Sequence, residues 1–197
     1  MKKTILAAAA ALIATASLTA QTTIKPRAEI GLNLGNLEAK HSELVDFGIV
    51  AGLRLGASLE VGLSQSALSE VYLAPGLYYK QHGSMASKLG SENRLSMQSL
   101  ALPVNLGLRA SLGNDLGVSL EFGPYFSYML SSRYLGQSKD EDLKRFDAGI
   151  NGSVALEYQR YFLRLGAEYG LTDLNKPKIE DNYLRNLGIF TTVGMRF

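Results

Sequence analysis

Alternation of apolar residues with small or polar ones runs through nearly the whole chain, and no other feature constrains the fold as strongly. In residues 116–131, one face carries valine, leucine, phenylalanine, proline and tyrosine. The opposite face carries glycine, serine, Glu121, Tyr125 and Met129. A period of two residues is typical of a β-strand, because successive side chains point to opposite faces. Helical periodicity is weak, so the sequence predicts an all-β fold.

Eight segments show this alternation. We expect strands at residues 27–36, 46–63, 69–82, 94–110, 116–131, 144–158, 161–173 and 186–197. The connections Ser64–Leu68, Ser111–Asp115 and Gln159–Arg160 are short, whereas residues 38–45, 83–93, 132–143 and 174–185 form longer polar loops. Gly113, Asn114 and Asp115 in the second short connection are a turn signal. Tight turns alternating with long loops are typical of a membrane barrel, and an even number of strands closes an up-and-down ring.

The polar face separates a membrane barrel from a soluble one. Alternation alone also fits a sandwich or a lipocalin-like barrel with its apolar face inside. A strand surface that faces water favours threonine and long charged residues, whereas glycine weakens a strand. The polar face of this chain is rich in glycine with scattered charges, which suits a narrow lumen. The sequence therefore predicts an eight-stranded antiparallel up-and-down transmembrane β-barrel.

Residues 1–20 read as a signal peptide. Lys2 and Lys3 precede an apolar run at residues 5–13 that is too short to span a bilayer, and small residues follow. We expect cleavage after Ala20, although cleavage after Ala16 fits the small-x-small pattern better. Residues 21–197 then form one barrel domain. These features predict export and an integral position in a bacterial outer membrane.

Composition excludes several classes of function. Without Lys2 and Lys3 the chain holds 18 basic against 18 acidic residues, so no basic excess indicates nucleic-acid binding. The chain has no cysteine, which excludes disulfides and thiol chemistry. It has two histidines, His41 and His82, without the spacing of metal ligands. His41 is adjacent to Ser42 and Glu43, which is the wrong arrangement for a catalytic triad. We therefore expect no enzyme activity, no metal and no cofactor.

Charged residues on the glycine-rich face are the candidate site. The alternation points eleven of them into the lumen, and five positive charges meet six negative ones: Glu29, Arg54, Glu60, Lys80, Arg109, Glu121, Asp147, Glu157, Arg164, Glu168 and Arg196. One interpretation is a selective charged pore. The other is a plug of ion pairs that fills a narrow barrel, since eight strands leave room only for side chains. We favour the plug, because a pore would carry charge of one sign and have more strands.

Aromatic residues gather near the ends of the apolar face and predict two girdles at the membrane surfaces. Tyr79, Tyr128 and Phe146 lie toward the long loops, and Tyr158, Tyr161 and Phe197 lie toward the short turns. Three prolines inside predicted strands, Pro75, Pro103 and Pro124, each remove a hydrogen-bond donor from the sheet, and we expect bulges or kinks there.

Several segments together resemble the porin-like outer-membrane β-barrel family of Bacteroidetes-type bacteria, including its PorT-like members. They are residues 31–37, 73–83, 100–104, 121–130 and 168–174, followed by the strand to Phe197. The resemblance implies an eight-stranded outer-membrane barrel and no single activity, since some members are accessory parts of secretion machinery. It also implies that Phe197 is the terminal aromatic that the barrel-insertion machinery reads. Gly76 departs from the family, which often has a glutamate there.

Three functions follow as hypotheses. The first is a structural or surface-interaction barrel with a filled lumen, and it is favoured by the long polar loops. The second is a narrow pore for small solutes or ions. The third is a lipid-modifying enzyme or an accessory barrel of a secretion system. We expect a monomer whose partners are membrane lipid and lipopolysaccharide, together with the assembly machinery during insertion.

Overall fold

The computed structural model describes residues 23–39, 46–88, 91–134, 137–138, 144–174 and 184–197. They form nine strands: β1 (Ile24–Ala39), β2 (Asp46–Gln65), β3 (Ser69–Lys88), β4 (Ser91–Gly113), β5 (Leu116–Tyr134), β6 (Gln137–Ser138), β7 (Phe146–Tyr158), β8 (Tyr161–Gly170) and β9 (Leu184–Arg196). None of the described residues forms a helix long and apolar enough to cross a membrane. The all-β prediction is confirmed.

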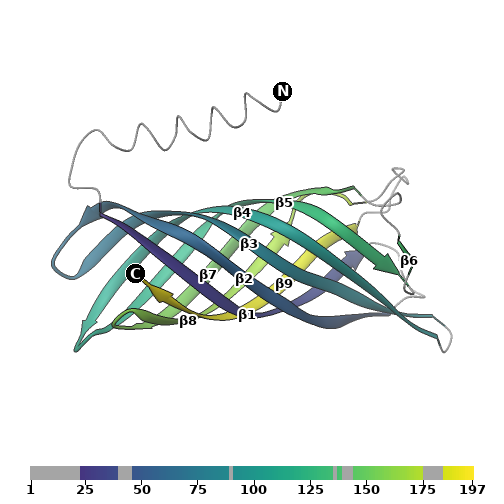
Figure 1. The fold of residues 1–197 in the computed structure, drawn as a ribbon, viewed down its shortest axis with the longest axis horizontal. Coiled ribbons are helices and arrows are strands. Elements are labelled where there is room, and N and C mark those ends of the chain that lie inside the picture. Colours follow the sequence, from purple (N-terminus) through teal and green to yellow (C-terminus); the bar gives the residue numbers. More distant parts are fainter. Residues whose placement is uncertain (1–22, 40–45, 89–90, 135–136, 139–143, 175–183) are drawn as a thin grey trace, which may run out of the picture.

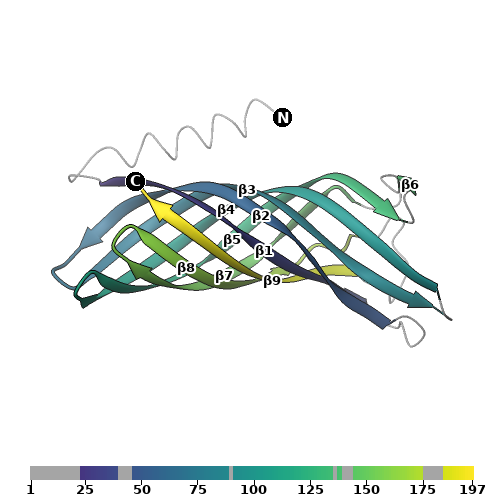
Figure 2. The same cartoon turned by 60° about the horizontal axis from the view of Figure 1, so that its bottom comes forward.

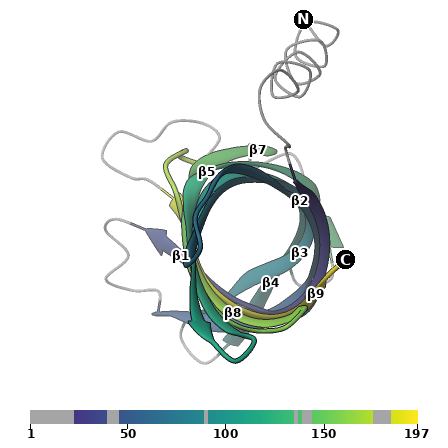
Figure 3. The ribbon, with the colours of Figure 1, turned by 90° about the vertical axis from the view of Figure 1, so that its left-hand side faces the viewer.

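Eight of these strands close into one antiparallel barrel. Neighbours along the chain pair with one another, β7 pairs with β5, and β9 returns to β1. The two-residue β6 adds only a short pairing at the end of β5. Figures 1 and 2 show the long, tilted strands, and Figure 3 looks along the axis at the closed ring. The predicted eight-stranded up-and-down barrel is therefore confirmed.

The strands reach further toward the long loops than the sequence predicts. The largest difference is the loop expected at residues 83–93, where β3 and β4 continue to pair as far as Lys88 and Ser91. In the other direction, β7 begins two residues late at Phe146 and β8 ends early at Gly170. Beyond β8 the chain still follows β7, because the Ala148 amide donates to the Thr172 hydroxyl at 3.0 Å.

The short connections have the geometry of tight turns. Asn114 and Asp115 both have positive φ, at 50° and 64°, in the two-residue turn between β4 and β5. Asparagine and aspartate tolerate this left-handed region better than most residues, so the predicted turn signal has a physical basis. In the turn between β7 and β8, Gln159 has a φ of 53°. These turns and the end of β9 lie at one end of the barrel in Figure 1, called here the turn side.

The expected bulges at the prolines are wrong. The β3–β4 pairing stops between Pro75↔Val104 and Tyr78↔Ala101 and resumes in the same register, since both strands advance three residues. A proline removes a donor without inserting a residue, so the pairing is interrupted but not shifted. The register shifts lie elsewhere, between Ile49 and Arg54 in β2 and between Gln98 and Ser99 in β4, for example.

The two faces of the wall are sharply different. Burial alternates along β5 and β8, so that every second residue is hidden inside the barrel. Outward residues such as Leu120, Leu163 and Val193 are each at least half exposed. A wall with leucine and valine outside and charged residues inside is the reverse of a soluble barrel and matches a membrane barrel.

Candidate functional site

All eleven charged residues that the sequence points inward lie on the inner face of the wall. Nine are at most 7% exposed, and the side chains of Arg109 and Arg196 are 11% and 13% exposed. Three more charged residues share this face: Lys25, Arg27 and Glu70. The predicted five positive and six negative charges thus become seven of each.

The three inward residues that the sequence did not predict follow the same alternation as the other eleven. Lys25 and Arg27 have the parity of Glu29, and Glu70 has the parity of Lys80, so each points inward on its strand. Lys25 lay outside the predicted first strand, which began at residue 27. Arg27 and Glu70 lay at strand starts, where alternation gives the least evidence.

The inward charges fall into two groups along the axis. The turn-side cluster holds five cations and five acids: Lys25, Arg27, Arg109, Arg164, Arg196, Glu29, Glu60, Glu70, Glu121 and Glu157. The loop-side cluster holds Arg54, Lys80, Asp147 and Glu168. Each cluster has equal numbers of acidic and basic residues, which is how buried charge is tolerated in a low-dielectric interior.

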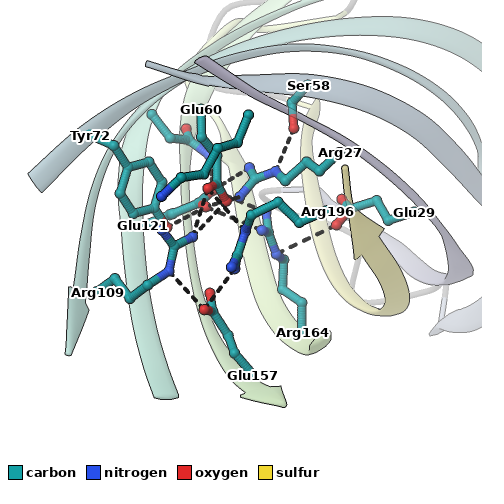
Figure 4. Close-up of polar contacts among 12 residues, drawn as sticks. Arg27, Glu29, Ser58, Glu60, Tyr72, Arg109, Glu121, Glu157, Arg164 and Arg196 are labelled. Atoms are coloured by element: carbon teal, nitrogen blue, oxygen red, sulfur yellow. Dashed lines mark hydrogen bonds and ion pairs between the residues drawn. The ribbon is translucent and has the colours of Figure 1, made fainter. Parts of the chain in front are cut away.

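Glu121 on β5 is the centre of the turn-side cluster (Figure 4). Both of its oxygens accept from Arg27 on β1 and from Arg164 on β8. Tyr72 donates its hydroxyl at 2.9 Å and Asn105 its amide at 3.3 Å. Because these donors come from four other strands, this one carboxylate ties opposite walls together across the lumen.

Arg109 on β4 connects the rest of the turn-side cluster. It donates to Glu60 at 2.7 and 2.8 Å and to Glu157 at 2.7 Å, and it also pairs with Glu70. Arg196 bridges two of these acids as well, with an ion pair of 2.7 Å to Glu157 and one of 3.1 Å to Glu60. These contacts extend the network to the turn-side mouth.

Glu29 differs from the other acids of this cluster. Its side chain is 1% exposed, and among the described residues neither of its carboxylate oxygens accepts a hydrogen bond. The nearest cationic atom in an ion pair is Arg164 Nε, at 3.5 Å. Arg164 thus lies between a carboxylate with many donors, Glu121, and one with few.

The loop-side cluster combines ion pairs with aromatic rings. Glu168 accepts from Arg54 and from Lys80, each at 2.6 Å. The Arg54 guanidinium lies 4.0 Å from the ring centre of Phe190 and 4.7 Å from that of Tyr78. Lys80 Nζ lies 4.7 Å from the ring centre of Tyr125, whose hydroxyl donates to Asp147 at 2.9 Å.

Each inward aromatic ring faces a glycine on the neighbouring strand. The five pairs are Tyr72↔Gly107, Tyr78↔Gly56, Tyr125↔Gly149, Phe162↔Gly194 and Phe190↔Gly166. At all five glycines an added Cβ would lie less than 3.0 Å from the ring opposite. These five glycines therefore make room for flat rings, a role that the alternation alone did not predict. Gly76, where the resembling family often has a glutamate, lies against the Tyr78 ring in the same way.

The aromatic residues predicted as girdles lie on the outer face. On the loop side, Tyr128 pairs with Phe146, which stacks on Phe126 with ring centres 6.3 Å apart, and Tyr79 is half-buried. On the turn side, Tyr158 pairs with Tyr161 across the tight turn, and both are exposed. The Phe197 amide donates to the Pro26 carbonyl at 2.8 Å, so the pairing of β9 with β1 continues to that residue.

The residues considered for catalysis or metal binding come together nowhere in the described part of the chain. His41, Ser42 and Glu43 lie outside the described residues, and of His82 the structure describes only its pairing with Met97. Among described residues, no three histidine, cysteine or acidic side chains are grouped to hold a metal ion. What the described residues of the lumen do show is ion pairing across the bore.

Comparison with known proteins agrees with this architecture. The sequence profile of a family described as "Outer membrane protein beta-barrel domain" matches residues 19–176. No curated protein sequence matches the chain significantly.

Three solved structures illustrate the likeness. Neisserial surface protein A has a TM-score of 0.53 at 11% identity, with 90% of this chain and 100% of that chain covered. The outer membrane enzyme PagL has a TM-score of 0.50 at 13% identity, with 85% and 97% covered. The attachment invasion locus protein of Yersinia pestis has a TM-score of 0.42 at 12% identity, with 88% and 98% covered. At these identities the likeness concerns the fold alone, and the third structure is only loosely similar.

Proposed function

Because the chain belongs to the outer membrane protein β-barrel domain family and is a barrel of the bacterial outer membrane, we propose that it is a non-conducting barrel that anchors interaction loops at the cell surface. The loops in question are the longer connections predicted at residues 38–45, 132–143 and 174–185, and most of their residues lie outside the described part of the chain. The role of the barrel is to hold their ends at fixed positions on a stable ring.

One observation carries this proposal: charged side chains bridge opposite walls of the lumen at two levels. Arg27 and Arg164 meet at Glu121 on the turn side, and Arg54 and Lys80 meet at Glu168 on the loop side. An eight-stranded barrel has an interior just wide enough for its side chains. Two such levels support a lumen that is closed to ions.

A narrow pore is the second candidate, and the balance of charge argues against it. Channels can select ions with rings of charge of one sign, whereas the described residues of this lumen include seven cations and seven acids, most of them joined in ion pairs. An ion entering the lumen would have to displace ion pairs that are already formed. We therefore assign these residues to closure of the barrel.

We also propose that the protein is not an enzyme and that it acts as a monomer in contact with lipid and lipopolysaccharide. The outward aromatic residues on both sides support contact with two membrane surfaces. Phe197, at the end of the pairing between β9 and β1, fits a signal read by the insertion machinery, and deleting it should lower outer-membrane levels. The likeness to PagL shows a shared fold and supports no activity here.

The test is conductance of the refolded protein in a planar lipid bilayer. We expect no stable conductance steps from the wild-type barrel. The double variant Arg27→Ala, Glu121→Ala opens one of the two levels and should at most flicker, because the loop-side cluster stays closed. Stable steps from the wild type would overturn the proposal and favour the pore. Release of fatty acid from lipopolysaccharide by the purified protein would instead favour the enzyme.

A further inference from the structure

The outer surface of the wall has a hollow near the turn side, separate from the lumen. It is a groove of about 650 Å³ that runs over five neighbouring strands, β5, β7, β8, β9 and β1. Its lining is almost wholly apolar and includes Leu116, Leu156, Leu163 and Val193. Ala28 is the smallest outward side chain in the lining, and it pairs with Met195 on β9.

The rim of the groove is polar, because two turns are tied together there. The Gln159 amide donates to the Asp115 carbonyl at 2.8 Å, and the Gln159 side chain donates to the Asp115 carboxylate at 3.2 Å. Asp115 directly precedes Leu116, and Arg160 directly precedes Tyr161, and both Leu116 and Tyr161 line the groove. Asp115 and Arg160 are exposed, so an anion and a cation lie at the same edge.

Two phenol rings connect the apolar groove to this rim. Tyr158 and Tyr161 pair across the turn, line the groove and are each 56% exposed. A tyrosine at a membrane surface keeps its ring in the apolar region and its hydroxyl among the headgroups. The hollow thus has the polarity profile of one lipid molecule, apolar along its length and charged at one end.

We propose that this groove binds one zwitterionic phospholipid of the periplasmic leaflet. The short turns of such barrels face the periplasm, so the rim lies at the headgroups of that leaflet. One acyl chain lies over Ala28, the phosphate contacts Arg160 and the tyrosine hydroxyls, and the ammonium group contacts Asp115.

Native mass spectrometry of the detergent-solubilised barrel tests this proposal. Dioleoyl phosphatidylethanolamine carries the ammonium group, and dioleoyl phosphatidylglycerol lacks it. We expect one retained ethanolamine lipid per wild-type barrel. Arg160→Gln should weaken retention of both lipids by about tenfold, the effect of losing one charge-assisted contact. Asp115→Asn, which keeps a residue suited to positive φ, should remove only the preference for ethanolamine.

Filling the groove gives the second arm. Ala28→Leu should abolish retention, whereas the matched control Ala51→Leu, at another outward alanine on β2, should leave it unchanged. Equal retention by the wild type, Ala28→Leu and Arg160→Gln would overturn the proposal. A dimer that Ala28→Leu dissociates would overturn it too, since the groove would then be an interface between two copies. Asp115→Asn and Arg160→Gln lie in turns outside the barrel wall, so they test lipid binding even if Ala28→Leu fails to fold.

Discussion

The turn-side and loop-side halves of the lumen both place cations against aromatic rings, and they differ in how their acids are shared. On the turn side, ten charged residues contact one another, and single carboxylates such as Glu121 and Glu60 each accept from more than one arginine. On the loop side, Glu168 alone bridges two cations, and three rings cover their remaining surface. Aromatic faces attract cations and also fill volume, so the rings on the loop side supplement the ion pairs that both cations form with Glu168.

This difference predicts which substitutions destabilise each half of the lumen. A network of arginine forks has several alternative partners, yet it depends on acids that are shared. A cation between rings loses little when one ring is removed, but among the described residues Arg54 and Lys80 form ion pairs with one acid only, Glu168. Variants of matched chemistry in the two halves therefore separate the contribution of ion pairs from that of rings.

The largest effect is expected from Glu121→Ala. It deprives Arg27 and Arg164 of their shared carboxylate inside the barrel, which should cost about 3–5 kcal/mol of the free energy of unfolding. Arg27 keeps Glu60 at 3.0 Å, so the barrel should still fold. A urea titration in lipid vesicles, with the folded fraction read from gel mobility, measures the loss. Glu121→Gln is the control for shape, and an unchanged midpoint for Glu121→Ala would contradict the central role of this residue.

Glu168→Ala should have a smaller effect, roughly 3 kcal/mol, at the low end of the same range. It removes the acid that Arg54 and Lys80 share, but the rings of Tyr78, Phe190 and Tyr125 still face the two cations. The same titration compares the two variants directly. If Glu168→Ala lowered the free energy of unfolding more than Glu121→Ala does, the rings would not compensate for the lost carboxylate.

The strands of the barrel wall could be predicted from the sequence, because they all follow the same alternation of inward and outward residues. Alternation with period two assigned the inward side of all eleven charged residues, and the limits of the eight strands to within three residues except at the end of β3, which extends six residues further. Turn chemistry at Asn114 and Asp115 placed one connection correctly. These features are local, so a single sequence contains them.

The partners across the lumen could not be predicted. Whether Arg27 meets Glu121, 94 residues away, depends on the number of strands and on their stagger around the ring. Alternation predicts which face of the wall a residue lies on, but not its position along the barrel axis. The inward rings were missed for a related reason: Tyr72 and Phe190 fit inside only because Gly107 and Gly166 lie directly opposite, and that register is a property of the folded sheet.

Overpacking of the ring sites comes next in size. Gly166→Val pushes a side chain into Phe190 on the loop side, and Gly107→Val does the same to Tyr72 on the turn side. Both should cost about 1–3 kcal/mol. We expect the greater loss at Gly107, because Tyr72 both lies 4.7 Å from the Arg109 guanidinium and donates to Glu121, whereas Arg54 keeps the Tyr78 ring when Phe190 is displaced. At Gly152 an added Cβ meets its nearest atom at 3.5 Å, so Gly152→Ala should be nearly neutral in the same titration.

The smallest effect isolates the attraction between ring and cation. Phe190 and Phe162 both point inward and face a glycine, but Phe190 lies 4.0 Å from Arg54, whereas Phe162 lies 5.1 Å from Arg164 and 5.9 Å from Arg27. Phe→Leu removes the ring and keeps most of the apolar volume at either site. Phe190→Leu should therefore exceed Phe162→Leu by about 0.5–1 kcal/mol, the value of a close cation–ring contact. Equal losses in the urea titration would show that the rings act as filler alone, and the loop-side half would then depend on Glu168 as the turn side depends on Glu121.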